Sequence, residues 1–460
     1  MSSKYVKILR ERLSSSIGLP FRDILPEDMI QRTLEEENIK YRKRLYDPII
    51  TLWIFIRQVL DPDKSCKKAV SVALSILSDS VSDSGEELPS GDTGAYCKAR
   101  KRLSLSFIIR LFRHTGQTIH QRPTDEFLWC NRRVSLVDGS TFSMYDTPQN
   151  QKQFPQPKNQ YKYHGFPVAR ILGIFSLATG AVIDAAIDSF WVPEIKLFRE
   201  LYSHLKPGDV ILGDRLYGSY GDIALLSGKS VDCVFRMHHL RKTDFSKGKR
   251  LGSNGVCDHL VTWKKPRQGT IRLEPELYDQ LPETMLLREV RYFLHIKGYR
   301  TREVTLVTTL LDHHIYTYEL LAELYGFRWQ VEVNFRHLKT TMQMEHIQSK
   351  TPEMVRKEFY VHLLAYNLMR ATLWEAGVKH NVHPLRLSYK GAIQYVLSFV
   401  SILAFIKDRE SIYGIMLTVI SQDKLLERPF RVEPRMVRAK KRSFPRLTRP
   451  RQEIRQELIA

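Results

Sequence analysis

Between residues 134 and 238 the sequence changes from helical to strand-like patterns, and this change constrains the fold most. Short apolar, β-branched runs predict strands in VSLVDG (134–139), VARILGIFSLATGAVIDAAID (168–188, two strands joined by a turn), DVILGDRLYG (209–218) and VDCVFRMH (231–238). A helix is predicted for EIKLFRELYSHLKPG (194–208), which ends with Pro and Gly. The order strand, strand, strand, helix, strand predicts a mixed sheet in an α/β fold.

Charge narrows the class of partner. The chain has 71 Lys and Arg against 50 Asp and Glu, a formal net charge of +21. This surplus favours a polyanionic partner, and nucleic acid over a membrane surface, although a merely basic protein is the alternative. The five cysteines are scattered and contain no C-x-x-C pair, and the N-terminus is unlike a signal peptide. The most hydrophobic run, residues 395–406, is too short to span a bilayer. We therefore predict a cytoplasmic protein with no membrane partner.

Shifts in composition divide the chain into five regions. We predict a helical N-terminal DNA-binding region (1–125), the first part of the core (126–238), a β-rich insertion (239–315), a core helix (316–350) and a helical C-terminal region with a basic tail (351–460). A loop is predicted at 78–94, and an extended basic arm at 435–455. One cluster of cations suits either phosphate contacts or a solvated helix face: Lys98, Arg100, Lys101 and Arg102.

Two of the predicted strands end in aspartate, at Asp138 and Asp214. Side chains at the ends of neighbouring strands meet at one edge of a sheet. Phosphodiester chemistry at neutral pH needs a weak oxygen nucleophile to be activated and developing charge to be neutralised, and two Mg²⁺ ions held by carboxylates do both. A single Asp after a strand is more often a turn residue or a helix cap, so a third carboxylate is needed to support this hypothesis.

The third carboxylate is predicted in YGFRWQVEVNFRHLK (325–339), a helix with a buried stripe. At 100° per residue, Tyr325, Arg328 and Lys339 lie within about 40° of Glu332. The apolar stripe is adjacent to them: Val331, Phe335, Leu338 and Met342. Glu332 is thus predicted to lie where the helix meets a cleft and to bind metal. The alternative is an Arg328–Glu332 ion pair at i,i+4 on an exposed face.

These residues resemble the motifs of a known family. Tyr325, Arg328, Glu332 and Lys339, with two, three and six residues between them, resemble the YREK signature of the insertion-sequence-four family of bacterial DDE transposases. LVDGST around Asp138 and GDRLYG around Asp214 resemble the two catalytic-aspartate motifs of that family. The strand-rich insertion between the second Asp and the Glu is similar too. The resemblance covers about residues 90 to 350.

The resemblance implies a fold and a reaction. The fold is an RNase H-like mixed-sheet catalytic core with a β-rich insertion, flanked by helical N-terminal and C-terminal regions. Asp138, Asp214 and Glu332 would bind two Mg²⁺ ions, with Mn²⁺ as the alternative. The reaction is cut-and-paste transposition of double-stranded DNA, in which the terminal inverted repeats are cleaved through a hairpin and the 3′-OH is joined to target DNA. Two subunits would bridge two ends.

The resemblance also implies DNA contacts. Tyr325, Arg328 and Lys339 would contact phosphates near the cut end, and Trp329 would help to pocket a displaced base. Trp263 of the insertion would stack on the flipped base, although an aromatic residue of a small β core is the alternative. Arg236, just past a strand, is a predicted phosphate contact.

Two other classes of function fit the same residues. A non-enzymatic sequence-specific DNA-binding protein, either an inactive transposase copy or a repressor, would keep the basic surfaces without the chemistry. A metal-dependent nuclease would cut DNA without joining a 3′-OH to a second molecule. The three acids in family order favour the transposase.

Overall fold

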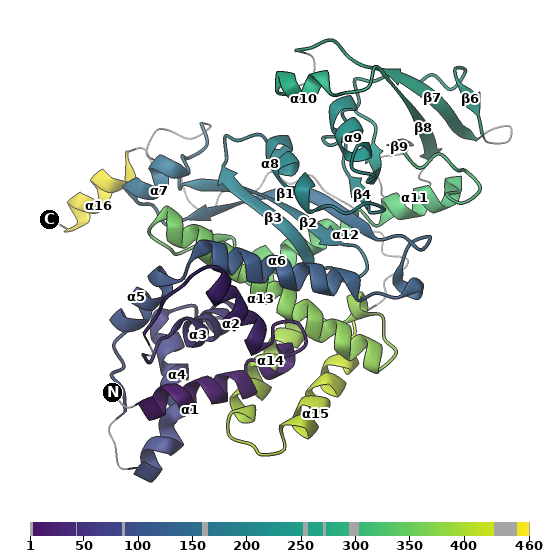
Figure 1. The fold of residues 1–460 in the computed structure, drawn as a ribbon. Coiled ribbons are helices and arrows are strands. Elements are labelled where there is room, and N and C mark those ends of the chain that lie inside the picture. The colour runs from purple at the N-terminus through teal and green to yellow at the C-terminus, as the bar shows by residue number, and fades with distance from the viewer. Residues whose placement is uncertain are drawn as a thin grey trace.

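One mixed sheet with helices on both faces organises the chain (Figure 1). The computed structural model describes residues 3–42, 44–84, 88–158, 164–251, 256–269, 273–293, 303–426 and 449–459. Helices α6 (Leu105–Gln121) and α13 (Pro352–Lys379) cover one face of the sheet at strand β3, while α8 (Glu194–Glu200) and α9 (Tyr220–Ser227) pack on the other. The predicted α/β class is confirmed.

The strands of the described ranges form a single sheet in the order β3-β2-β1-β4-β5-β9-β8-β7-β6, with β10 beside β1. β1–β2 and β2–β3 are antiparallel, whereas β1–β4 and β4–β5 are parallel. This mixed five-strand unit is the predicted RNase H-like core. The strands are β1 (Val134–Met144), β2 (Val168–Ser176), β3 (Val182–Ser189), β4 (Val210–Gly213), β5 (Asp232–Arg236), β6 (Lys249–Arg250), β7 (Cys257–Lys264), β8 (Thr284–Phe293), β9 (Glu303–Thr308) and β10 (His346–Ile347).

The predicted end of the first strand is wrong. β1 does not stop at Gly139 but continues to Met144, because its second half pairs with β2 along its whole length and with β10 at Ser143 and Met144. Asp138 therefore lies inside β1 and not at its end. Asp214, in contrast, directly follows the last residue of β4, as predicted.

The strand-rich insertion extends the core sheet. β9 pairs antiparallel with β5 of the core, β8 pairs with β9, and β7 pairs with β8. Figure 1 shows this part of the sheet projecting from the core together with the short helix α10 (Pro275–Asp279). The insertion is thus fixed to the strand that ends at Arg236.

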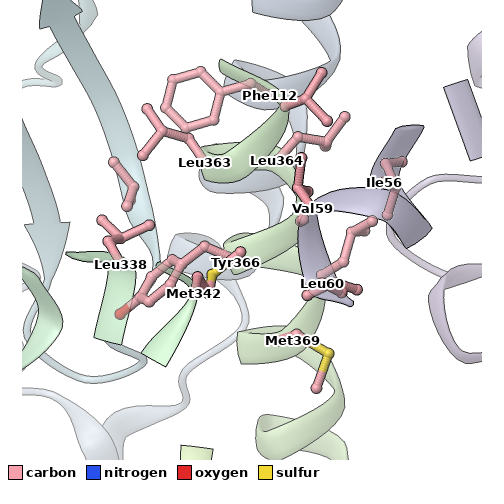
Figure 2. Close-up of a cluster of buried hydrophobic side chains, with 14 of the residues drawn as sticks. Ile56, Val59, Leu60, Phe112, Leu338, Met342, Leu363, Leu364, Tyr366 and Met369 are labelled. Atoms are coloured by element: carbon pink, nitrogen blue, oxygen red, sulfur yellow. The ribbon is translucent and has the colours of Figure 1, made fainter. Parts of the chain in front are cut away.

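The helices before and after the sheet form one packed body. Helix α13 contacts α3, α6, α14 and α15, and most of its residues are buried. Figure 2 shows Leu363, Leu364 and Met369 of α13 among side chains of α3 and α6. The remaining helices are α1 (Ser3–Ser15), α2 (Glu27–Glu36), α3 (Pro48–Leu60), α4 (Cys66–Ser84), α5 (Gly94–Arg102), α7 (Pro148–Gln153), α14 (Tyr389–Leu403), α15 (Arg409–Gln422) and α16 (Arg451–Ile459), with 3₁₀ turns at Leu19–Phe21, Asp125–Phe127, Tyr202–His204 and Pro384–Arg386.

Two segments predicted to be irregular are partly helical. Residues 78–84 belong to α4, which extends from Cys66 to Ser84 without a proline or glycine to end it earlier. At the C-terminus, residues 451–455 of the predicted extended arm lie in α16, whose sequence RQEIRQELI after Pro450 contains no further proline. Residues 435–448 of that arm lie outside the described residues. Of the helices described, none is both long and apolar enough to cross a membrane.

The cation cluster in α5 contains both exposed and buried residues. Lys98, Lys101 and Arg102 are exposed on α5. Arg100 is buried: its guanidinium lies 4.2 Å from the ring centre of Phe55 and donates to Gln58 Oε1 at 3.2 Å. Arg100 therefore holds α5 on α3 and is not placed to contact DNA.

The predicted single helix over 325–339 is interrupted. Helix α11 (Tyr318–Gly326) ends after Tyr325, and α12 (Trp329–Arg336) begins after Arg328, which is its N-cap. A π-helical turn, His337–Thr341, follows directly. The predicted apolar stripe is confirmed, since Val331, Phe335, Leu338 and Met342 are all buried. Leu338 and Met342 lie against α13 in Figure 2, which anchors the π turn.

A buried histidine on α13 predicts that acid destabilises the protein. Burial lowers the pKa of His362 to about 3, and its Nδ1 lies 2.8 Å from the carbonyl oxygen of Glu358. The unfolded value is about 6.5, so the folded state binds fewer protons below pH 6.5. The contribution of His362 to the free energy of unfolding is fully present well above pH 6.5 and is about 1.4 kcal/mol smaller at pH 5.5.

Urea unfolding at pH 7.5 and pH 5.5 checks this prediction. The variant His362→Gln, whose amide can still donate to Glu358, is expected to lose about 1.4 kcal/mol less than the wild type between the two pH values. The exposed His239→Gln serves as the matched control and is expected to follow the wild type. An identical pH dependence in wild type and His362→Gln would contradict the assignment.

Candidate active site

Strand register brings the two predicted aspartates together. β1 and β4 run parallel with Leu136 opposite Leu212, and the same register carried two residues further sets Asp138 beside Asp214. Side chains alternate between the faces of a strand, so the carboxylate of Asp138 points to the face that buries Leu136. Asp214 directly follows β4, and its charge acts on Asp138. Helix α12, which carries Glu332, packs on β1 at this face.

Asp138 is partly buried and lies near two other carboxylates. Its pKa is raised to about 7, mainly because the carboxyl is buried and also because the carboxylates of Glu194 and Asp214 lie near it. The backbone N–H of Gly139, which donates to Oδ1 at 2.9 Å, and the guanidinium of Arg328 act in the opposite direction. Two carboxylates and one guanidinium thus act on Asp138, and a cation bound beside the acids would favour its ionised form.

Glu332 is paired with a cation in this structure. Nη2 of Arg328 donates to its Oε1 at 3.0 Å, which is the i,i+4 ion pair considered as an alternative from the sequence. The pair is not on an open helix face, since the Arg328 side chain is only 24% exposed and its charge also acts on Asp138. Arg328 thus interacts with both Glu332 and Asp138.

Tyr325 and Arg236 lie in the same cluster. Tyr325 is buried in the last turn of α11, and burial raises the pKa of its hydroxyl. Its hydroxyl interacts electrostatically with Arg328, Arg236 and Asp214. The structure therefore brings Arg236, at the end of β5, to the predicted site, although Arg236 and Tyr325 lie almost 90 residues apart in the chain.

Trp329 and Lys339 take different positions around Glu332. The Trp329 side chain is 49% exposed at the start of α12, so its ring is accessible. Lys339 lies in the π turn after α12 and is half-buried. Turns of this kind often occur at functional sites.

Trp263 lies away from solvent, in the core of the insertion. It is 4% exposed, its indole N–H donates to Glu289 Oε1 at 2.7 Å, and the guanidinium of Arg241 lies 3.5 Å from its ring centre. This is the position expected of an aromatic residue of a small β core. In this arrangement its ring is not accessible to a base, so stacking on a flipped base stays a prediction that requires Arg241 to move.

Two residues of the cluster are absent from the predicted site residues. Glu194, the first residue of α8, reaches the backbone of Gly139, and Tyr217 donates a hydrogen bond to its Oε1 at 2.5 Å. Tyr217 belongs to the GDRLYG motif, so its proximity to Asp214 could have been predicted. Glu194 follows a proline at the start of a helix, where acids are common, and the sequence contains no signal for its role.

The acids fit a divalent cation. Asp138 and Asp214 offer carboxylate oxygens, which Mg²⁺ prefers, and the charge of Asp214 acts on Asp138. Within the described ranges, no three His, Cys, Asp or Glu side chains lie close enough to hold a metal as they stand. Glu332 would have to exchange Arg328 for the cation to complete a three-acid site.

A family match identifies the chain. Residues 129–368, more than half of its length, match the family model described as transposase DDE domain, and the three predicted acids all lie within this range. The chain belongs to the DDE transposase family. Enzymes of this family cut DNA and join it.

Relatives of this DDE transposase extend the match beyond the core. Transposase InsG for insertion sequence element IS4 of Escherichia coli K12 is 26% identical over 436 residues, which cover 93% of this chain and 91% of the relative. The transposase for insertion sequence element IS421 of E. coli is 31% identical over 182 residues, 34% of this chain and 49% of that protein. The predicted membership of the insertion-sequence-four transposases is confirmed.

A solved structure is also similar to this DDE transposase. It is the cryo-EM structure of a piggyBac transposase synaptic complex with hairpin DNA, with a TM-score of 0.43 and 10% identity over 90% of this chain and 86% of that one.

Proposed function

We propose that this transposase cleaves double-stranded DNA at the terminal inverted repeats of its element and joins the freed 3′-OH to target DNA. Asp138, Asp214 and Glu332 are the proposed catalytic acids. The observation that carries the proposal is the register of β1 and β4, which sets two carboxylates side by side on the face where α12 brings Glu332 and Arg328.

Asp138 and Asp214 would hold the divalent cations, Mg²⁺ or in its place Mn²⁺, and Glu332 would complete the site. When bound, two such ions activate the attacking oxygen and neutralise charge on the phosphate. The partly buried position of Asp138 suits this role, because a carboxyl that is costly to ionise alone gains most from a cation beside it.

Arg328 is proposed to exchange partners when DNA binds. Its guanidinium now donates one hydrogen bond to Glu332, and a DNA phosphate offers anionic oxygens that a guanidinium can bind in pairs. Transfer of Arg328 to a phosphate would free Glu332 for the cation. The Arg328–Glu332 ion pair is then the DNA-free state of the site and not an alternative to its function.

The other residues of the cluster are proposed to hold the DNA end. Tyr325 and Arg236 flank Asp214 and can bind phosphates near the cut. Lys339 can contact a phosphate from the π turn, and the exposed ring of Trp329 can stack on a displaced base. Residues 1–125 and the basic tail are proposed to bind the flanking duplex.

The route of the reaction is proposed from the family. Cleavage through a hairpin, with two subunits bridging two ends, is the expected course, and it would take place in the cytoplasm where bacterial DNA lies. The base flipped in the hairpin step could stack on Trp263 only after Arg241 leaves the face of its ring.

A strand-transfer assay separates this proposal from a simple nuclease. A pre-cut duplex from the boundary of the element, labelled and ending in a 3′-OH, is incubated with the protein, Mg²⁺ and a plasmid target. We expect labelled plasmid from the wild type and none from Asp214→Asn. Efficient cutting of the uncut duplex with no joined product would instead identify a nuclease.

A further inference from the structure

We propose that Glu194 is a positioning residue of the active site, whose negative charge strengthens divalent cation binding at Asp138 and Asp214. The inference rests on the proposed metal site and adds a fourth acid to it. Glu194 lies outside the three sequence motifs that contain Asp138, Asp214 and Glu332.

The local packing brings Glu194 to the strand that carries Asp138. Glu194 begins α8, which packs on β2 and β3 beside β1. Its carboxylate occupies the space next to Gly139, where an added Cβ would meet Oε2 at 2.1 Å. Glycine at position 139 is what allows this approach. The carboxylate therefore supports the Asp138 backbone from the opposite face of the sheet.

A hydrogen bond ties the same carboxylate to the second aspartate motif. The Tyr217 hydroxyl donates to Oε1 of Glu194, and Tyr217 is fully buried against the core on that face. Tyr217 lies three residues after Asp214, in the turn where the N–H of Leu216 donates to Asp214 Oδ1 at 2.7 Å. Glu194 thus links helix α8 to the turn that orients Asp214.

The charges around Glu194 leave an excess of negative charge. Asp138 and Asp214 interact with it electrostatically, and Arg170 of β2 is the cation that acts on it. The Arg170 guanidinium is shared, because Nη1 also donates to the carbonyl oxygen of Val192 at 3.0 Å. The Arg328 guanidinium, which acts on Asp138, is shared as well, because it donates to Glu332. Three carboxylates against two shared cations favour a divalent ion on the side of Asp138 and Asp214.

Manganese binding to the purified protein tests the inference without relying on activity. Electron paramagnetic resonance of free Mn²⁺ gives the dissociation constant at fixed pH. We expect Glu194→Gln, which keeps the size of the side chain and an acceptor for Tyr217, to bind Mn²⁺ about tenfold more weakly than the wild type. Glu194→Asp, which keeps the charge, is expected to recover most of the affinity.

Two controls separate the local effect from charge and folding. Glu200→Gln removes the same charge from an exposed position on the same helix and is expected to bind like the wild type. Thermal unfolding of each variant shows that it is folded.

The manganese measurement distinguishes a failure of the role of Glu194 from a failure of the proposed metal site. Wild-type affinity in Glu194→Gln, with loss of binding in Asp138→Asn, overturns the role of Glu194 and leaves the metal site intact. Equal weakening in Glu200→Gln also overturns it, since the effect would then be one of net charge. Wild-type affinity in Asp138→Asn overturns the proposed metal site itself.

Discussion

Asp138→Asn is expected to lower the rate of Mg²⁺-dependent cleavage at the element end by at least about 1000-fold. The amide would remove one of the proposed cation ligands, so the proposed site would no longer hold the cations that activate the attacking oxygen. The measurement is a time course of cleavage of a labelled duplex, with a gel-shift assay of DNA affinity beside it. DNA affinity is expected to stay close to that of the wild type.

This substitution is not expected to unfold the protein. The pKa of Asp138 is raised to about 7, chiefly by burial, so the neutral amide resembles a form that the folded protein already contains. It also removes repulsion with Glu194 and Asp214. The free energy of unfolding should therefore be unchanged or slightly higher.

Asp188→Asn is the matched control for the cleavage experiment. Asp188 lies near the end of β3 in the same sheet, half-exposed, 3.9 Å from Arg356. It is expected to cleave at the wild-type rate. Near-wild-type cleavage by Asp138→Asn would contradict the assignment of Asp138.

Asp258→Ala is expected to lower the free energy of unfolding by about 3–5 kcal/mol. Arg288 of β8 is completely buried, and its Nε and Nη2 donate to Asp258 of β7 at 2.8 and 2.6 Å. Nη1 donates to the carbonyl oxygen of Tyr316 at 2.6 Å. Without Asp258 the guanidinium would remain buried with no opposite charge at its Nε and Nη2.

Urea unfolding measures this loss, with Glu303→Ala as the control. Glu303 of β9 pairs with Arg291 of the same strand β8 at 3.1 Å, but its side chain is 48% exposed. Exposed ion pairs contribute about 0–1 kcal/mol, so the control should change little. Similar losses of unfolding free energy in Asp258→Ala and Glu303→Ala would contradict the prediction, because they would show that burial does not set how much the Arg288–Asp258 pair stabilises the protein.

The core strands and the approach of Asp138 to Asp214 could be predicted from the sequence because local patterns mark the strands and the aspartates beside them, whereas the RNase H-like fold was implied by the family resemblance. Each core strand is a short β-branched run bounded by turn residues, and the two aspartates follow such runs. The prediction placed Asp138 at a strand end, whereas pairing with β2 and β10 continues β1 past it. Pairing over long separations in sequence cannot be read from one segment.

Features that depend on side-chain contacts between distant segments could not be predicted. The helix predicted over 325–339 is divided at Arg328, although its periodicity continues through the interruption. Arg100 belongs to a basic cluster in sequence, yet it is buried on Phe55. Glu194 reaches Gly139 only because α8 packs on β2 and β3, which lie beside β1 in the folded chain.

The most direct test of the central claim is cleavage of a duplex from the element boundary in Mg²⁺ by the wild type and by Glu332→Gln. We expect only the wild type to cleave at the boundary, and we expect the cleaved end to be capped by a hairpin. Both proteins should bind the duplex. Equal cleavage by both proteins would contradict the role of Glu332. Tight binding by both with no cleavage in Mg²⁺ or Mn²⁺ would contradict the enzyme and favour a non-catalytic DNA-binding protein.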